Sequence, residues 1–386
     1  MQGQDQYRPS RRKVLKRGAI ASGTFVISGT GIAGAQPGKA SGKNTKCDIV
    51  VPDEYGTIQA AVDNASAGDT ICIKQGTYEE DVSVDKGVTL RGQNAPNSNN
   101  PATVDGRISV DSGGDNTAVR RLRITSSETF AGGTFPDPFG VRVKASGVTV
   151  ENNVIEDFTA NLSNGEGSFS LHGVQVFGET AISDITVRNN VIRGFESDGD
   201  PSTWPNHGGI AGIKAQADVE NVTVEDNEVT DHHSAGWVWG VVLTASGSAS
   251  GVPKSVTVEK NDISELNDGS VYDVFAGPND GRDAAPYPGS AFGIGGGADA
   301  TEATVKQNNL LAPNGAESKD GAHSLVAECN WWGDKSGPTD DDNPDGTGMW
   351  VLERGAATID YTPWLTAPAP SKACNGGEKG NNGNGQ

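Results

Sequence analysis

The chain has 386 residues, with 53 Gly, 50 Asp and Glu against 30 Lys and Arg, and a formal net charge of −20 at pH 7. A glycine share of this size without a Gly-X-Y period excludes collagen, and the acidic balance argues against nucleic-acid binding because phosphates would be repelled. After residue 35 no apolar run approaches the roughly 20 residues that span a bilayer.

The N-terminus carries paired arginines in the run SRRKVLK, which begins at Ser10. A Gly- and Ala-rich apolar stretch follows, and residues 33–35 (Ala-Gly-Ala) form a small-residue cleavage site. Residues 1–35 thus resemble a twin-arginine signal peptide, which implies an extracellular or cell-surface protein, and residues 36–46 are expected to form a linker. The segment carries a net +5, so its removal takes the charge from −20 to −25. Such an acidic surface is typical of proteins that work in high salt.

A repeated octapeptide occupies the middle of the chain. It reads VTVENNVI from Val148, ITVRNNVI from Ile185, VTVEDNEV from Val222, VTVEKNDI from Val256 and ATVKQNNL from Ala303. Apolar residues at every second position predict one half-buried β-strand in each unit. One such strand cannot bury its apolar face alone, so the units must stack with equivalent positions superposed. The repeat therefore predicts a parallel β-solenoid.

An asparagine follows each strand of the repeat, and it is interpreted as a structural ladder of stacked amides in a left-handed turn. The positions are Asn153, Asn190, Asn227, Asn261, Asn308 and Asn330. The last interval, 22 residues, is a bare coil, and the longer intervals predict inserted loops. Each insertion precedes a second short strand that begins with glycine, at Gly140, Gly173, Gly212, Gly240 and Gly293. The loops are therefore expected along one edge.

Two end segments carry a family resemblance. Residues 55–94 contain the stretch TIQAAVDNA from Thr57, then Gly-Asp-Thr from Gly68 and Gly-Thr-Tyr from Gly76, and the chain closes with Cys-Asn-Trp-Trp-Gly from Cys329. These segments resemble right-handed parallel β-helix proteins of the pectin-lyase-like superfamily. The resemblance implies an all-β, single-stranded right-handed parallel β-helix over residues 47–365, with a short N-terminal capping helix. Residues 366–386, rich in Pro, Ala, Gly and Asn, are expected to form a disordered tail.

Four cysteines allow three disulfide connectivities. If one coil takes about 22 to 25 residues, Cys47 and Cys72 sit on stacked neighbours and can form a bridge. The pairing of Cys329 and Cys374 stays open at this point.

The expected loops hold side chains suited to acid-base chemistry beside aromatic rings that can stack on sugars. Catalytic candidates are His207, Asp231, His233 and Arg282. Substrate-binding candidates are His172, Asp198, Asp200, Trp204, Trp237, Trp239 and Tyr272. The alternative is that these His and Trp residues anchor the loops onto the solenoid.

Two mechanisms fit the candidates. For β-elimination of a uronate, His207 or His233 would be the base and Arg282 would stabilise the enolate-like charge. For glycoside hydrolysis, Asp198 or Asp200 would face Asp231. The aspartate motifs of pectin methylesterases are absent from the sequence, so that activity has little support.

A weak metal candidate lies near the C-terminus. Asp341, Asn343 and Asp345 match the early ligands of an EF-hand loop, so Ca²⁺ is the one cofactor considered. Pro344 and Leu352 depart from that pattern, so a looser Ca²⁺ site or a plain acidic loop fits the residues better than a true EF-hand.

The sequence predicts a protein, expected to be monomeric, that binds or processes extracellular polysaccharide or a cell-envelope glycan, including lyase action on an acidic glycan. The contrasting hypothesis is a non-catalytic surface, adhesion or scaffold protein. With −25 on the mature chain, an anionic substrate requires a locally basic groove or Ca²⁺.

Overall fold

The computed structural model describes residues 46–131, 137–161, 170–197, 209–234, 238–245, 251–266, 290–295, 302–318, 324–353, 358–370 and 374–376. The expected signal peptide and residues 36–45 of the expected linker lie outside this part of the chain. Among the described residues, no helix is both long and apolar enough to cross a membrane.

The fold begins with β1 (Ile49–Val51) and the helix α1 (Ile58–Asn64). Thr57 caps the helix, because its hydroxyl accepts a hydrogen bond from the Ala60 backbone N–H at 3.1 Å. The carboxylate of Glu80 accepts two more, from the first backbone N–H groups of the helix. Ile58, Ala61 and Val62 lie in the core, as expected for a capping helix.

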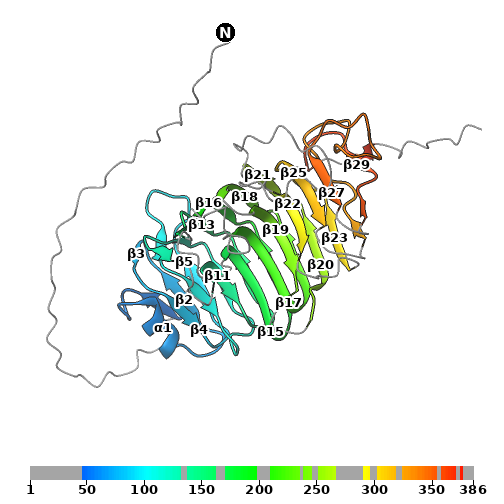
Figure 1. Cartoon of the computed structure of the whole chain (residues 1–386). Coiled ribbons are helices and arrows are strands. Elements are labelled where there is room, and N and C mark those ends of the chain that lie inside the picture. Colours follow the sequence, from blue (N-terminus) through cyan, green and yellow to red (C-terminus); the bar gives the residue numbers. More distant parts are fainter. Residues whose placement is uncertain are drawn as a thin grey trace, which may run out of the picture. The chain divides into compact units, whose positions relative to one another are not determined.

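After the helix the chain coils through three files of parallel strands (Figure 1). The first file, which follows β1, contains β2 (Thr70–Ile73), β5 (Thr89–Gly92), β8 (Ala118–Arg120), β12 (Thr149–Glu151), the ends of β15 (Ser170–Arg188) and β17 (Gly209–Glu225), β20 (Lys254–Glu259), β23 (Ala303–Lys306), β26 (Leu325–Val326) and β28 (Ile359–Asp360). The second contains β3 (Gly76–Tyr78), β6 (Ala102–Asp105), β9 (Arg123–Thr125), β13 (Val154–Glu156), β16 (Val191–Ser197), β18 (Glu228–Ser234), β21 (Asp262–Ser264) and β24 (Asn309–Leu311), with β10 (Thr129–Ala131) and β14 (Thr159–Asn161) alongside.

The third file runs along the strands that begin with glycine in the sequence pattern. It contains β4 (Val82–Val84), β7 (Ile108–Val110), β11 (Phe139–Val143), the starts of β15 and β17, β19 (Val238–Thr244), β22 (Ser290–Gly295), β25 (Asn314–Ser318) and β27 (Trp350–Glu353). Because β15 and β17 bridge the first and third files, these two files form one 18-stranded sheet.

Strand register confirms the predicted apolar files. Val150 pairs with Val187, Val187 with Val224, and the same position continues to Val258 and Val305. All five side chains are buried in one continuous core. The architecture is a parallel β-helix, and its right hand, expected from the resemblance, stays a prediction.

The asparagine ladder is confirmed, with one correction to its backbone. The amide of Asn153 donates to the side chain of Asn190 at 3.0 Å, and the same contact repeats down to Asn330. The left-handed residue is the one before each ladder asparagine, such as Asn152 (φ 56°) or Asn189 (φ 53°). The turn at that residue directs the ladder side chain inward, where its amide satisfies buried backbone groups.

One disulfide lies at each end of the β-helix. Cys47 is bonded to Cys72, as the coil length predicts, and Cys329 is bonded to Cys374. The second bridge and the antiparallel pair β29 (Trp364–Leu365) and β30 (Cys374–Gly376) hold the chain end against the last coil. The ordered fold therefore extends past the expected boundary at residue 365, since a covalent bond fixes part of the expected tail.

Candidate active site

The outward side of the third file holds a row of buried polar side chains. Val141 and Val143 point into the core, so Arg142 between them points out of it. Strand register continues this position through successive coils, and we call it the outer row: Arg142, Gln175, Lys214, Val242, Gly293 and Glu317. Arg142, Lys214 and Glu317 expose only 5%, 8% and 6% of their surface.

Hydrogen bonds fix the guanidinium of Arg142. Its Nε donates to Oε1 of Gln175 at 2.8 Å, and its Nη2 donates to the backbone carbonyl of Asp137 at 2.6 Å. The guanidinium carbon lies 4.0 Å from the ring centroid of Phe139. Gln175 in turn donates to Gln216 at 3.1 Å. The planar cation is therefore held in one orientation, as recognition of a carboxylate requires.

Burial shifts the protonation of both cations in the outer row. Burial lowers the pKa of the Lys214 ammonium to about 8; the charge of Arg142 adds to this effect and the Asp137 carboxylate opposes it. Burial also lowers the pKa of Arg142 to about 10. Lys214 thus loses its proton around pH 8, whereas Arg142 keeps its charge there.

Asp137 and His172 flank this pair of cations. Burial would raise the pKa of Asp137, but its contact with His172 and the charge of Lys214 outweigh burial and lower it. His172 is wholly buried, with Nε2 3.5 Å from an Asp137 carboxylate oxygen. Burial lowers the pKa of His172 to about 4, so the imidazole is neutral at pH 7. It is a buried neighbour of the site rather than an exposed sugar contact.

The outward face changes character beyond β17. Ala211, Trp239 and Val242 form an apolar cluster separate from the core. Glu317 accepts hydrogen bonds on Oε2 from the Ser290 hydroxyl at 2.8 Å and from the Trp239 indole at 3.3 Å. Trp350, one strand further on, is 49% exposed. A carboxylate and aromatic rings therefore follow the cationic part of the face.

Two of the remaining catalytic and substrate-binding candidates lie within the described residues, on a different sheet. Asp231 and His233 lie on β18 of the second file, where His233 Nε2 is 3.1 Å from Asp231 Oδ1 in an exposed pair. They share a sheet with neither Arg142 nor Lys214. Six candidates lie outside the described residues: Asp198, Asp200, Trp204, His207, Trp237 and Tyr272. Arg282 also lies outside them.

The residues of the C-terminal metal candidate form a turn, in which the side chain of Asn343 bonds to the backbone. The amide of Asn343 donates to the backbone carbonyls of Ser336 and Pro338, at 3.0 and 2.8 Å. Within the described ranges, no group of three or more His, Cys, Asp or Glu side chains is placed to hold a metal ion. Asp341, Asn343 and Asp345 therefore form no such group in this structure.

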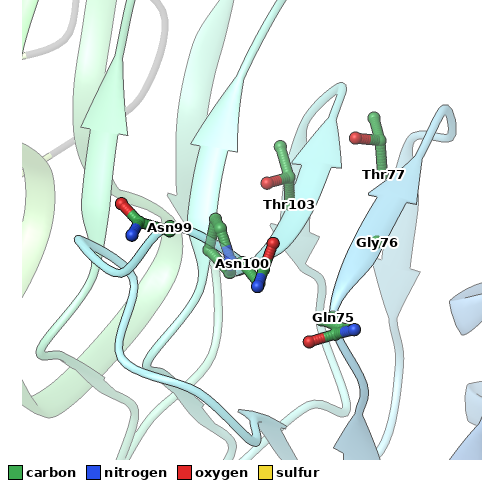
Figure 2. A pocket seen from close by; sticks show the side chains of 7 residues that line it. Gln75, Gly76, Thr77, Asn99, Asn100 and Thr103 are labelled. Carbon is green, nitrogen blue, oxygen red and sulfur yellow. The ribbon is translucent and has the colours of Figure 1, made fainter.

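A separate pocket of 290 Å³ lies at the beginning of the second file (Figure 2). Thr77 and Thr103 sit side by side on β3 and β6, and Gln75, Asn99 and Asn100 complete the polar lining. Its lining holds no titratable side chain, so the pocket offers no acid-base chemistry.

The sequence did hold a signal for the missed cations. Behind the aligned glycines the strands read Val-Arg-Val, Val-Gln-Val and Ile-Lys-Ala, from residues 141, 174 and 213. The central polar residue in each triplet stands at the same register position. Arg142 and Lys214 stand at outward positions of the strands themselves, not in the inserted loops where the sequence candidates were sought.

Comparisons with known proteins find only distant likeness. No family model matches the chain, and no curated protein matches it. Among solved structures, Escherichia coli ybhc is 13% identical over 85% of this chain and 88% of its own, with a TM-score of 0.36. An alginate lyase from Paenibacillus sp. strain FPU-7 is 15% identical over 78% and 95%, with a TM-score of 0.34. The A-module of mannuronan C-5 epimerase AlgE6 from Azotobacter vinelandii is 15% identical over 81% and 94%, at 0.27. None of these similarities assigns an activity.

Proposed function

We propose that this protein is an exported polysaccharide lyase that cleaves a uronate-containing glycan by β-elimination, with Lys214 as the base. The observation that carries the proposal is a buried lysine, with a pKa of about 8, on the same outward row as a fixed arginine. A base that titrates near working pH is what proton abstraction beside a carboxylate requires.

Arg142 supplies the electrostatic part of the mechanism. Its guanidinium, held by Gln175, pairs with the substrate carboxylate and stabilises the charge that develops when the adjacent C5–H bond breaks. Lys214 takes the proton and the electron pair moves into the carboxylate as an enolate. The C4–O bond then breaks, a C4=C5 double bond forms, and the leaving oxygen takes a proton from the Lys214 ammonium or from water.

Burial sets a condition on access. Because Arg142 and Lys214 are almost fully buried, the proposed reaction requires that the site open before a glycan can reach them. Burial also strengthens both interactions with the substrate, since charges act more strongly where water is excluded.

The resemblance of residues 1–35 to a twin-arginine signal peptide supports export, and the two disulfides fit an oxidising exterior. Together with the acidic composition, they support a protein that acts outside the cell in high salt.

The test is incubation of the mature protein with acidic and neutral polysaccharides in molar salt, with and without Ca²⁺. Absorbance at 235 nm detects the new double bond, and a reducing-end assay detects any cleavage. We expect both signals to rise together, and K214M to lower the rate by at least about 100-fold. H233N, in the exposed pair, serves as the control with unchanged rate.

Reducing ends without absorbance at 235 nm would replace elimination by hydrolysis. Glycan binding without either signal would favour the adhesion or scaffold hypothesis.

A further inference from the structure

The pocket at the beginning of the second file is lined by polar side chains that the fold itself hardly uses. Among the described residues, two hydroxyls and two side-chain amides of the lining make no hydrogen bond, those of Thr77, Thr103, Asn99 and Asn100. The fifth polar side chain is Gln75, whose carbonyl oxygen lies 3.5 Å from the amide nitrogen of Asn94. Donors and acceptors therefore surround a hollow of 290 Å³ with most of their hydrogen-bonding capacity unused.

Backbone contacts fix the walls of this pocket. The strands β3 and β6 pair in parallel register, and Thr77 and Thr103 point the same way from them (Figure 2). The Gly76 N–H donates to the Pro101 carbonyl at 3.1 Å, which joins the two coils at the pocket. In the loop before β6, the Asn94 amide donates to the backbone carbonyl of residue 100 at 2.7 Å. The lining is therefore held in place before a ligand arrives, which lowers the cost of ordering it on binding.

The lining also restricts the chemistry of a ligand. It contains no charged side chain, so neither a phosphate nor a carboxylate would find an ion-pair partner in it. Five of its seven residues have polar side chains, so an apolar ligand would leave hydrogen-bonding groups unpaired. Amides and hydroxyls supply both donors and acceptors, which is what the hydroxyls of an uncharged sugar require. The volume of 290 Å³ lies just below the roughly 300–1,000 Å³ of pockets for drug-sized ligands, and it suits one or two sugar rings.

We propose that this pocket is a second glycan-binding site, which holds an uncharged sugar unit through its hydroxyls. The pocket lies on a different sheet from Arg142 and Lys214, so binding there does not rest on the proposed lyase function. A glycan held in this pocket anchors the protein and raises the local concentration of glycan chains around it.

Calorimetric titration with soluble polysaccharides tests the site. The neutral probes are dextran, galactomannan and arabinoxylan, and the acidic probe is polygalacturonate. We expect the wild-type protein to bind at least one neutral polymer, and T77V/T103V to weaken that binding about tenfold because two hydroxyls are lost. Valine keeps the β-branched shape of threonine, so both strands should stay folded.

Salt and hydrogen exchange give two further readouts. Because the lining carries no charge, the dissociation constant for a neutral polymer should change less than about twofold between 0.5 and 3 M NaCl. Hydrogen exchange followed by mass spectrometry should slow over residues 75–77 and 93–103 when the polymer binds. K214M should bind the neutral polymer as the wild type does.

The matched control is T223V/T257V. These two threonines are also neighbours in parallel register, on β17 and β20, and they point outward from the first file. This variant should keep the wild-type affinity. The proposal would be overturned by neutral-polymer binding that T77V/T103V leaves unchanged, by binding of polygalacturonate alone, or by failure of all four polymers to bind.

Absorbance at 235 nm separates this proposal from the lyase function. Binding of a neutral polymer at the pocket, with no double bond formed on any uronate polysaccharide, would keep the second site and refute the lyase. Double-bond formation without binding of any neutral polymer would keep the lyase and refute the second site. On a soluble uronate polymer, T77V/T103V should form double bonds at the wild-type rate.

Discussion

The imidazole ring of His232 lies inside the β-helix. It is the last of four aromatic rings that stack from coil to coil, after three phenylalanines. The rings of Phe130, Phe158, Phe195 and His232 follow one another, and the last pair of centroids is 4.9 Å apart. Neither ring nitrogen has a hydrogen-bond partner within the described part of the chain. Burial lowers the pKa of His232 to about 3, so this histidine packs as an uncharged ring.

The buried histidines should make the fold sensitive to acid. The folded pKa of His172 and His232 lies below the ordinary value of 6.5, so the unfolded chain takes up two protons that the fold excludes. Their contribution to stability is complete above pH 6.5 and is lost as pH falls toward 4. Each histidine adds about 1.4 kcal/mol per pH unit to the fall in unfolding free energy.

The variant H232F tests this directly in urea unfolding between pH 7 and 4. As the pH falls, the unfolding free energy of H232F should decrease less steeply than that of the wild type, by about 1.4 kcal/mol per pH unit. The reason is that its unfolded chain binds one proton fewer. At pH 7 it should be at least as stable as wild type, since a buried unpaired polar ring is replaced by an apolar one. H233N, exposed, should keep the wild-type slope; the same slope in H232F would refute this role of His232.

At the element scale the third file depends on glycines that face the neighbouring coils. A Cβ added to Gly212 would lie 2.4 Å from Val229 Cγ1 and 2.7 Å from the carbonyl oxygen of Gly240. Gly173 is equally confined, against the carbonyl of Gly212. The glycine thus permits the close approach between coils that brings Arg142 and Lys214 onto one face.

Replacement G212A should therefore destabilise the protein by several kcal/mol, about 1–3 or more, through overpacking. Thermal or denaturant unfolding measures the loss, and G56A is the matched control because nothing lies within 4 Å of its added Cβ. Equal stability of the two variants would contradict the close packing.

The ladder asparagines form the other repeated element. Asn227 donates to Asn261 and to the Val187 carbonyl, and it accepts from both the side chain and the backbone of Asn190. N227A would leave these buried groups unpaired, so we expect a loss of about 3 kcal/mol or more. T223A, on the outward side of the same coil, should change stability little. A similar small effect in N227A would mean that water replaces the missing amide.

The elements that repeat in the sequence were predictable, whereas the site left only a weak signal, in the polar residues that follow the aligned glycines. Period two and the spacing of Asn153 to Asn330 determine the strands, because each coil must bury the same positions. The chemistry depends on which coil supplies each outward side chain, and Arg142 and Lys214 are brought together only by exact stacking of β11, β15 and β17. In the sequence, Asp231 and His233 are equally suitable for acid-base catalysis, yet the structure places them on another sheet.

For the whole molecule, charge is the dominant long-range feature. A formal charge of −20 repels itself in the folded state, and salt screens that repulsion over about 10 Å at 0.1 M and about 3 Å at 1 M. The melting temperature should therefore rise by several degrees between 0.1 and 2 M salt. An equal rise in NaCl and KCl would identify screening, whereas a constant or falling melting temperature would contradict adaptation to high salt.

The pH dependence of the elimination rate tests the central claim most directly. The substrate is a uronate polysaccharide that the protein has been found to cleave. Initial rates of absorbance increase at 235 nm are measured from pH 6 to 10 in molar salt. The rate should rise with an apparent pKa of about 8 as Lys214 loses its proton. K214M should abolish that rise while the protein still folds and binds the glycan. A wild-type rate that K214M leaves unchanged would show that Lys214 is not the base.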